Sequence, residues 1–259
     1  MGASQSELEP QSQSQPQQQQ QPHPHEPTRR ESWLLSPQRN AKPNETSSMM
    51  PVKPLKGLTL PHNCENILKG ADFDDKSSIW GKLSDKLYAG VFLDNKTKKY
   101  WVEKKSNGNC FMLYARSLSI TWAENHGYWK WVQQKEASGT MIEIAELKRV
   151  CWLEVHGKFD TRKLSPGILY QVSFVVMLKD WAEGWEIPIN FRLVLPGGKK
   201  QQHNEILMEK FGGWIEIPVG EFVASENDGG EMEISMYEYE GGMWKTGLLI
   251  KGIAIKPKH

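Results

Sequence analysis

The sequence predicts an all-β protein, a jelly-roll-like antiparallel β-sandwich with a short helical N-terminal extension and a disordered Gln-rich leader. Three observations support this. Apolar residues alternate with polar ones in short segments from Cys110 onward, as in residues 170–178, YQVSFVVML. Gly, Pro and Asp turns separate these segments. No long helical pattern intervenes, which favours a sandwich over a parallel α/β sheet.

The leader and linker span residues 1–60. Between Glu9 and Ser32 there is no apolar residue, and the run QSQSQPQQQQQPHPH consists entirely of Gln, Pro, Ser and His. Such a composition cannot bury enough surface to offset the entropy of ordering it, so this segment is predicted to be disordered. It is either a solvated leader or a self-association segment.

The first residues also carry a lipidation signal. Met-Gly-Ala-Ser-Gln-Ser matches the myristoylation pattern, with Gly2 as the acceptor. One acyl chain binds membranes only marginally, and the neighbouring Glu7 and Glu9 supply no basic second signal. At most, a weak and reversible membrane association is expected.

The helical extension is predicted over residues 61–95. Asn63 is the expected N-cap of a short helix that ends at Gly70, and Ser78 the cap of a second helix that ends at Gly90. A hairpin of two short strands around an Asp-Asn turn follows, in VFLDNKTKKYWVEK.

A single domain at residues 96–259 is predicted to hold the strands. Eight to ten are expected. Besides YQVSFVVML, the candidates are CWLEV, INFRLVL, WIEIPV, EMEISMYEY and LLIKGIAI, and the last is apolar on both faces, as a central strand would be.

Composition excludes several classes of function. A net charge of +1 favours neither nucleic acid nor an anionic membrane, and no apolar run approaches a membrane span. Three scattered cysteines predict no disulfide framework and no zinc site, which points to the cytoplasm or the nucleus. No nucleophile elbow, HExxH motif or phosphate-binding loop occurs, so neither an enzyme nor a cofactor or metal site is expected.

Aromatic residues supply the candidate binding surface. Trp122 precedes the polar loop AENHG, and Trp129 and Trp131 follow it two residues apart. These rings are either core or a stacking surface for sugars, whereas Trp152 is expected in the core between apolar strand residues. A second option, single-stranded nucleic acid, rests on the lysines around Tyr100 and Trp101 in KTKKYWVEKK.

Three carboxylates, Glu124, Glu231 and Glu238, are candidate acceptors for sugar hydroxyl groups. Glu231 and Glu238 are seven residues apart, so on an unbroken strand they point to opposite faces. Either a bulge intervenes, or Glu238 lies where the apolar face of the strand meets solvent.

Three long segments make the sequence similar to a known family. They are CFMLYARSLSITWAENHGYWKW, AELKRVCWLEVHGKFDTRKLSPGILYQVSFVV and GEMEISMYEYEGGMWKTGLLIKGIAIKP. They closely resemble the phloem protein 2 family of plant lectins, whose domain is shared with the tobacco lectin Nictaba. The resemblance implies a jelly-roll lectin without metal or enzymatic activity that binds N-acetylglucosamine oligomers and N-glycan cores. Its two binding tryptophans fall on Trp122 and Trp129, and its two acidic residues on Glu231 and Glu238.

The resemblance also implies partners and a location. N-glycoproteins and chitin oligomers are the expected partners. The sequence does not define the oligomeric state, and a homodimer is one of the assemblies open to it. The alternative is a structural phloem protein that associates with filaments or RNA and has a degenerate sugar site. Phloem companion cells and sieve elements are the expected location, in the cytoplasm or the nucleus. The loop 197–204 is shorter and less basic than its Nictaba counterpart, which counts against nuclear import.

Overall fold

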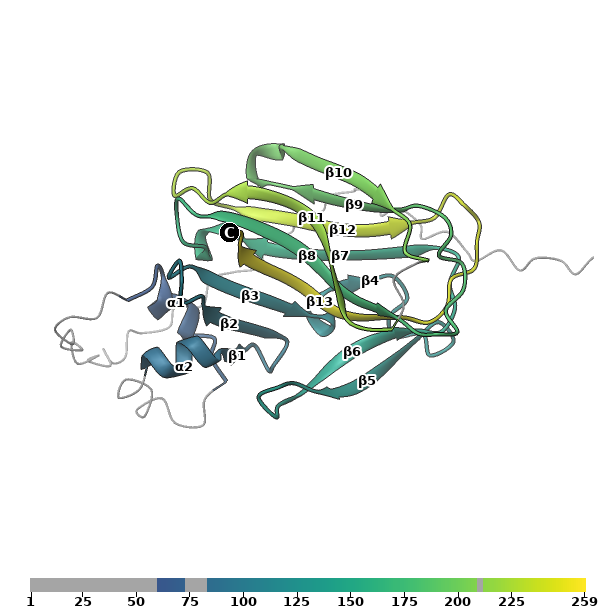
Figure 1. The fold of residues 1–259 in the computed structure, drawn as a ribbon, viewed down its shortest axis with the longest axis horizontal. Coiled ribbons are helices and arrows are strands. Elements are labelled where there is room, and N and C mark those ends of the chain that lie inside the picture. The colour runs from purple at the N-terminus through teal and green to yellow at the C-terminus, as the bar shows by residue number, and fades with distance from the viewer. Residues whose placement is uncertain (1–59, 73–82, 209–211) are drawn as a thin grey trace, which may run out of the picture. The chain divides into compact units, whose positions relative to one another are not determined.

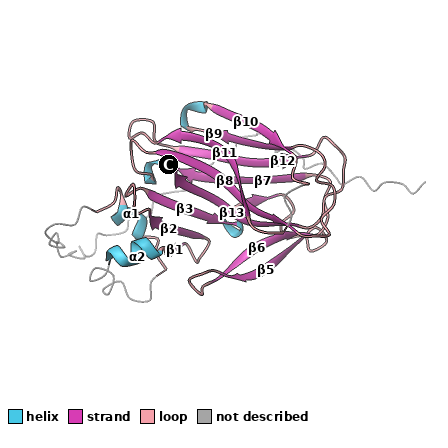
Figure 2. Cartoon of the chain, in the orientation of Figure 1, coloured by secondary structure: helices cyan, strands magenta, loops and turns pink. Residues whose placement is uncertain are grey.

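The computed structural model describes residues 60–72, 83–208 and 212–259 (Figure 1). The predictions for Gly2, for the leader up to residue 59 and for the Ser78 cap lie outside these ranges. The described residues form thirteen strands and two α-helices, and the strands pair antiparallel in two sheets (Figure 2). The all-β antiparallel prediction is therefore confirmed.

The larger sheet has eight strands in a branched order. The path runs β1-β2-β3-β13-β6-β5, and β8 pairs with both β13 and β11. The strands are β1 (Val91–Leu93), β2 (Lys98–Val102), β3 (Asn109–Tyr114), β5 (Trp129–Lys135), β6 (Met141–Leu147), β8 (Leu169–Leu178), β11 (Ile215–Val223) and β13 (Leu248–Pro257).

The smaller sheet has five strands in the order β10-β9-β12-β7-β4. These are β4 (Ser119–Ile120), β7 (Leu153–Asp160), β9 (Ile189–Val194), β10 (Lys200–Glu205) and β12 (Glu231–Glu238). Short 3-10 turns cover Ala115–Ser117, Thr161–Lys163 and Pro196–Gly198.

The core lies between the two sheets. Alternate residues of most strands point inward, so that rings from opposite sheets meet. The Phe174 and Phe191 centroids lie 6.0 Å apart, and those of Phe111 and Phe159 lie 4.8 Å apart. This burial is the main stabilising contribution to the fold.

β13 is the central strand of the larger sheet. It pairs with β8 along its whole length, and its other edge is shared by β6 at Leu249 and Ile250 and by β3 from Gly252 onward. The register with β8 shifts between Ile250 and Gly252, and Gly252 has a φ of 154°. A Cβ at this position would lie 1.9 Å from the carbonyl oxygen of Leu113, so only glycine fits the bulge where the sheet branches.

The helical extension packs on the sandwich. Helix α1 (Cys64–Leu68) and helix α2 (Leu83–Ala89) contribute buried residues to the same apolar cluster as the sheets. The side-chain amide of Asn109 donates to the carbonyl oxygens of His62 and Lys163, at 2.6 and 2.8 Å, and so ties the start of the extension to β3. Gly90, with a φ of 94°, follows α2 as predicted.

Asn63 lies at the N-cap position of α1, as predicted, but its side chain does not cap the helix. Its φ is 54°, and its carbonyl oxygen accepts a hydrogen bond of 3.1 Å from the Ile67 amide, whereas its side chain makes no capping bond. Its side chain instead bonds Asn66 at 2.7 Å and the carbonyl oxygen of Arg162 at 3.3 Å. The contact with the sandwich therefore replaces the local cap.

Candidate functional site

Trp122 lies in the turn that follows β4. This turn is closed by a hydrogen bond of 2.9 Å from the Asn125 amide to the Trp122 carbonyl oxygen, and Trp122 itself has a φ of 58°. Its ring is half-buried and tilts against Tyr128, with centroids 5.5 Å apart. Trp122 therefore keeps some surface for a ligand.

Trp129 does not form an open stacking surface. It is the first residue of β5, and its side chain is only 2% exposed. Its indole Nε1 donates to the Thr121 carbonyl oxygen at 3.1 Å, and its amide donates to the Asn125 carbonyl oxygen at 3.0 Å. Trp129 thus packs beneath the loop that carries Trp122 and holds its two ends together.

Glu238 is also buried, at 4% exposure, and forms an ion pair with the fully buried Lys245. Its Oε1 accepts hydrogen bonds from the backbone amides of Glu240 and Gly241. The Lys245 Nζ also donates to the carbonyl oxygens of Cys151 and Met243. This ion pair closes the turn after β12 and ties it to the segment before β7.

The sequence left two explanations open for the positions of Glu231 and Glu238: a bulge between them, or a solvent-facing Glu238 at the mouth of the strand. The pairing along β12 supports neither. β12 pairs with β7 without a break from Glu231 to Glu238, so no bulge intervenes. Glu238 points inward and has no solvent-facing position at the mouth of the strand. Glu231 points outward, is bound to Lys158 at 2.8 Å, and lies about 23 Å along the strand from Glu238.

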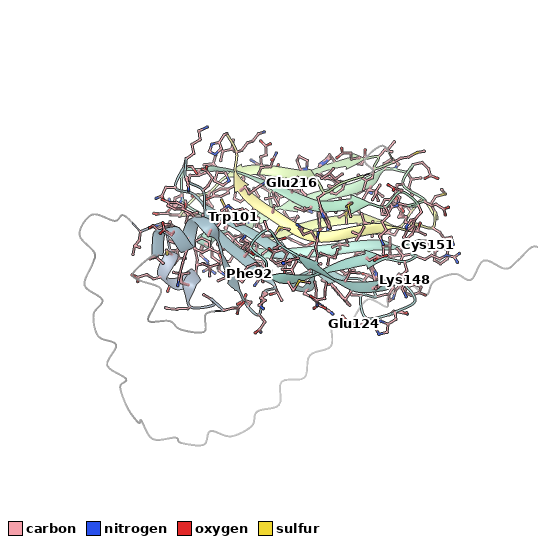
Figure 3. The ribbon with its side chains drawn as sticks, turned by 60° about the horizontal axis from the view of Figure 1, so that its bottom comes forward. Phe92, Trp101, Glu124, Lys148, Cys151 and Glu216 are labelled. Carbon is pink, nitrogen blue, oxygen red and sulfur yellow. The ribbon has the colours of Figure 1, made fainter. Side chains whose placement is uncertain are left out.

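The four residues therefore do not converge on one pocket. Trp122, Trp129 and Glu238 belong to one end of the sandwich, called the loop end here, which is formed by residues 121–129, 148–152 and 238–247. Figure 3 shows Glu124, Lys148 and Cys151 at this end, with Phe92 and Trp101 toward the other. Glu231 lies at the far end of β12.

A row of aromatic rings beginning at the loop end was missed by the sequence prediction. The Trp152 and Tyr239 rings stack with centroids 4.5 Å apart, at 18°, and Tyr239 and Tyr237 stack at 5.5 Å. The guanidinium of Arg192 lies 5.3 Å from the Tyr237 centroid. Tyr239 is 39% exposed, and Trp152 is half-buried, so the expectation that Trp152 belongs to the core is wrong.

The carboxylate of Glu154 lies beside this row. Its Oε2 accepts hydrogen bonds from the Thr121 hydroxyl at 2.9 Å and the Trp152 indole at 3.1 Å, and its Oε1 contacts His156 Nε2 at 3.1 Å. Burial alone would raise the pKa of Glu154, but the hydrogen bonds from His156, Trp152 and Thr121 outweigh it and lower the pKa. Glu154 is thus held as a carboxylate.

The polar network continues across the sheet. His156 Nδ1 lies 3.0 Å from the Ser235 hydroxyl and 3.5 Å from Glu233, and Glu233 reaches Arg192 at 3.5 Å. Its members come from β7, β12 and β9, and all point to the outer face of the smaller sheet. We call this surface the platform; it consists of Trp152, Glu154, His156, Arg192, Glu233, Tyr237 and Tyr239, with the buried Ser235 beneath them.

The platform could have been recognised from strand parity. Leu153 and Val155 are apolar and inward, which places Trp152, Glu154 and His156 outward together. The pairing that brings Tyr237 opposite Glu154 could not be read from the sequence. That pairing joins the two halves of the platform.

Other kinds of site find no support within the described ranges. No three His, Cys, Asp or Glu side chains there are close enough together to hold a metal ion. No helix in these ranges has the length and apolar character needed to cross a bilayer.

Fold and surface together define a β-sandwich module with aromatic rings and carboxylates on one sheet face. The family model for phloem protein 2 matches residues 108–257, which is more than half of the chain. The chain therefore belongs to the phloem protein 2 family, which is not a family of enzymes.

Individual relatives agree with this assignment. PHLOEM PROTEIN 2-LIKE A1 of Arabidopsis thaliana is 46% identical over 234 residues, covering 88% of this chain and 92% of that protein. A lectin of Luffa acutangula is 45% identical over 201 residues, covering 76% and 95%. The CBM22-1 xylan-binding domain from Paenibacillus barcinonensis Xyn10C covers 56% of this chain and 87% of that chain, at 12% identity and a TM-score of 0.32, which is too low to support a conclusion.

Proposed function

We propose that this protein is a lectin that binds N-acetylglucosamine oligomers and the cores of N-glycans along the platform. The observation that supports this most directly is the stacked row of Trp152, Tyr239 and Tyr237 beside the fixed carboxylate of Glu154. Aromatic faces suit the apolar faces of pyranose rings, and a few fixed polar groups supply orientation. The similarity to the Luffa lectin adds support.

The ligand in this proposal is an extended oligomer that runs along β12. Glu231, Glu233, Ser235 and Tyr237 alternate on the outer face of this strand, and Tyr239 continues the series past its end. From Tyr239 to Glu231 this surface spans about 26 Å at strand geometry. Affinity should therefore rise with the number of sugar units.

The four residues implied by the family resemblance take different roles in this proposal. Trp122 contacts the ligand at the loop end, and Glu231 contacts it at the distal end of β12. Trp129 and Glu238 are positioning residues, because the first holds the loop of Trp122 and the second holds the turn beside Tyr239.

A glycan array with the full chain tests the ligand, and titration calorimetry with chitin oligomers of increasing length tests its placement. We expect selective binding to these oligomers and at least a tenfold loss in Trp152→Ala. Leu169→Ala, at an exposed residue on the other sheet, serves as the control. The proposal fails if the array shows no glycan binding, or if Trp152→Ala leaves the Kd unchanged. RNA or filament binding without glycan binding would favour the structural alternative.

Family membership also supports a location in phloem, in the cytoplasm of companion cells and sieve elements. Acylation at Gly2 would add a reversible membrane association. Intact-mass measurement of protein made in plant cells tests the acylation, and a Gly2→Ala fusion to a fluorescent protein tests its effect on location.

A further inference from the structure

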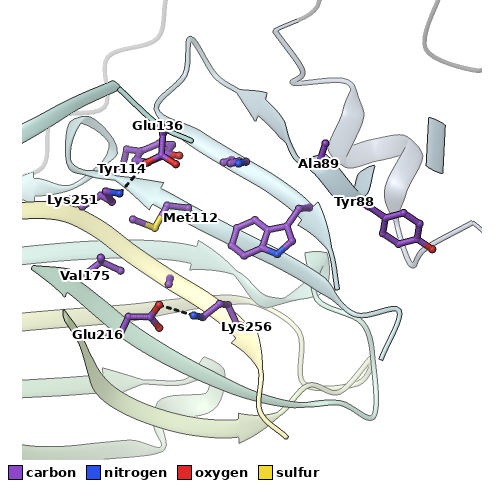
Figure 4. Close-up of a pocket in the computed structure, with 12 residues that line it drawn as sticks. Tyr88, Ala89, Met112, Tyr114, Glu136, Val175, Glu216, Lys251 and Lys256 are labelled. Carbon is purple, nitrogen blue, oxygen red and sulfur yellow. Dashed lines mark hydrogen bonds and ion pairs between the residues drawn. The ribbon is translucent and has the colours of Figure 1, made fainter. Parts of the chain in front are cut away.

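A second concave surface lies on the outer face of the larger sheet. It is a groove of about 400 Å³ between helix α2 and strand β11, and it crosses β2, β3, β13 and β8 (Figure 4). Met112, Val175 and Ala254 lie along its floor, and Trp101 contributes a half-buried indole. The platform is on the other sheet, so the two surfaces share no residue.

Two ion pairs border this floor. Lys251 Nζ lies 3.0 Å from Glu136 Oε1, and Lys256 Nζ lies 2.6 Å from Glu216 Oε1 (Figure 4). The side chains of Glu136 and Lys251 are only 15% and 20% exposed. Because each partner holds the other, these charged groups are oriented before a ligand arrives, and their remaining donor and acceptor sites are available to hydroxyl groups.

A third lysine gives the groove a surplus of positive charge. Lys99 lines it, and its ammonium lies 5.5 Å from the Phe92 centroid. Among the described residues, no carboxylate lies within ion-pair distance of Lys99. The three lysines that line the groove therefore face two carboxylates, and a neutral ligand would leave one ammonium uncompensated.

We infer that the groove binds an acidic oligosaccharide of two or three sugar units that carries uronate groups. The indole of Trp101 and the apolar floor would contact the apolar faces of the sugar rings, and the bordering ion pairs would bond the hydroxyl groups. One carboxylate of the ligand would pair with Lys99, and its other carboxylates would remain in solvent. A purely apolar ligand does not fit, because it would bury both ion pairs without replacing their contacts with water.

Titration of the full chain with trigalacturonate, followed by calorimetry and by the tryptophan indole signals in NMR spectra, tests this inference. We expect the Trp101 indole signal to shift, and the affinity to fall at least tenfold in Trp101→Ala and about fivefold in Lys99→Gln. The affinity should also fall with added salt. Trp101→Ala also removes apolar contacts of the indole with the sheet and so affects stability. Lys99→Glu should abolish binding without this loss of packing.

Controls separate this site from the platform. Trp152→Ala should leave the trigalacturonate affinity unchanged, and Trp101→Ala should leave chitin-oligomer affinity unchanged. A trisaccharide in which all carboxylates of trigalacturonate are reduced to alcohols is neutral. If it bound as tightly as trigalacturonate, the assigned role of Lys99 would be overturned. The absence of any trigalacturonate binding at millimolar concentration, or equal binding by wild type and Lys99→Glu, would overturn the groove as an acidic-sugar site, whatever the result at the platform.

Discussion

Trp129 and Trp152 both lie at the loop end, but their replacement should have different effects. Trp129 is buried beneath the Trp122 loop, so Trp129→Ala should cost about 3–5 kcal/mol of unfolding free energy. Trp152 lies on the outer face, so Trp152→Ala should cost far less and reduce glycan binding. Denaturant midpoints and calorimetry on the same samples check both. Equal destabilisation by the two changes would contradict the burial difference.

The Glu238–Lys245 ion pair yields a second prediction at this scale. Lys245→Met leaves a buried carboxylate without its cation, and we expect a loss of about 3–5 kcal/mol. Adding Glu238→Gln to that variant should recover part of the loss, because the uncompensated charge is removed. Urea denaturation of the single and double variants measures this coupling. A double variant as unstable as Lys245→Met would argue against charge burial as the cause.

A pH dependence follows from Glu154. Its pKa is lowered in the folded protein, so its ionised contacts stabilise the platform at pH values above its unfolded pKa of about 4.5. That contribution is lost as the pH falls through the lower folded pKa. We expect chitin-oligomer affinity to be constant above about pH 5 and to decline below about pH 4. Glu154→Gln should remove this decline, and an unchanged profile would contradict the role of Glu154.

Residue roles were less predictable from the sequence than the strands that carry them. Strand alternation identified Glu231 and Glu238 as facing opposite sides, and this is confirmed. The buried partner of Glu238, Lys245, comes from the far side of a turn whose closure no local pattern encodes. The apolar neighbours of Trp152 suggest burial, but strand alternation places its side chain opposite to the inward-facing Leu153 and therefore on the outer face.

At the scale of elements, Gly252 determines where the larger sheet branches. Gly252→Ala should cost about 3 kcal/mol or more, because its Cβ would meet the Leu113 carbonyl group. Gly167→Ala is the matched control: Gly167 also has a positive φ, 77°, but nothing lies within 4 Å of its added Cβ. That change should cost about 1–2 kcal/mol. Thermal unfolding of both variants compares them, and equal losses would argue against a steric effect at the bulge.

The alternation of apolar and polar residues predicted the long strands well, including β8, β9, β12 and β13. It did not identify the hairpin of β5 and β6. WKWVQQK has polar residues on both faces because β5 is an edge strand. MIEIAEL contains Met, Glu, Ala and Leu, which also have high helix propensity. The pairing of β6 with β13 and of β5 with β6 determines the conformation of these strands.

For the molecule as a whole, the extension and the sandwich share one apolar cluster. Cys64, Ile67 and Leu68 of α1 are buried in it, together with Leu83 and Leu87 of α2. Deleting residues 1–59 should leave the melting temperature and chitin-oligomer affinity almost unchanged, whereas deleting residues 1–72 should lower the melting temperature by about 10 °C or more. Differential scanning calorimetry of the two truncated chains checks this. Equal melting temperatures would show that α1 adds no stability.

The position of β13 has a consequence for the order in which the protein assembles. This strand follows every other strand in the chain, yet β3, β6 and β8 all form hydrogen bonds to it. During synthesis, three strand edges of the larger sheet therefore remain open until residues 248–257 have left the ribosome, while β7, β9 and β12 can already pair among themselves. A nascent chain arrested before residue 248 should thus expose apolar strand edges and recruit chaperones, and one released after residue 257 should not.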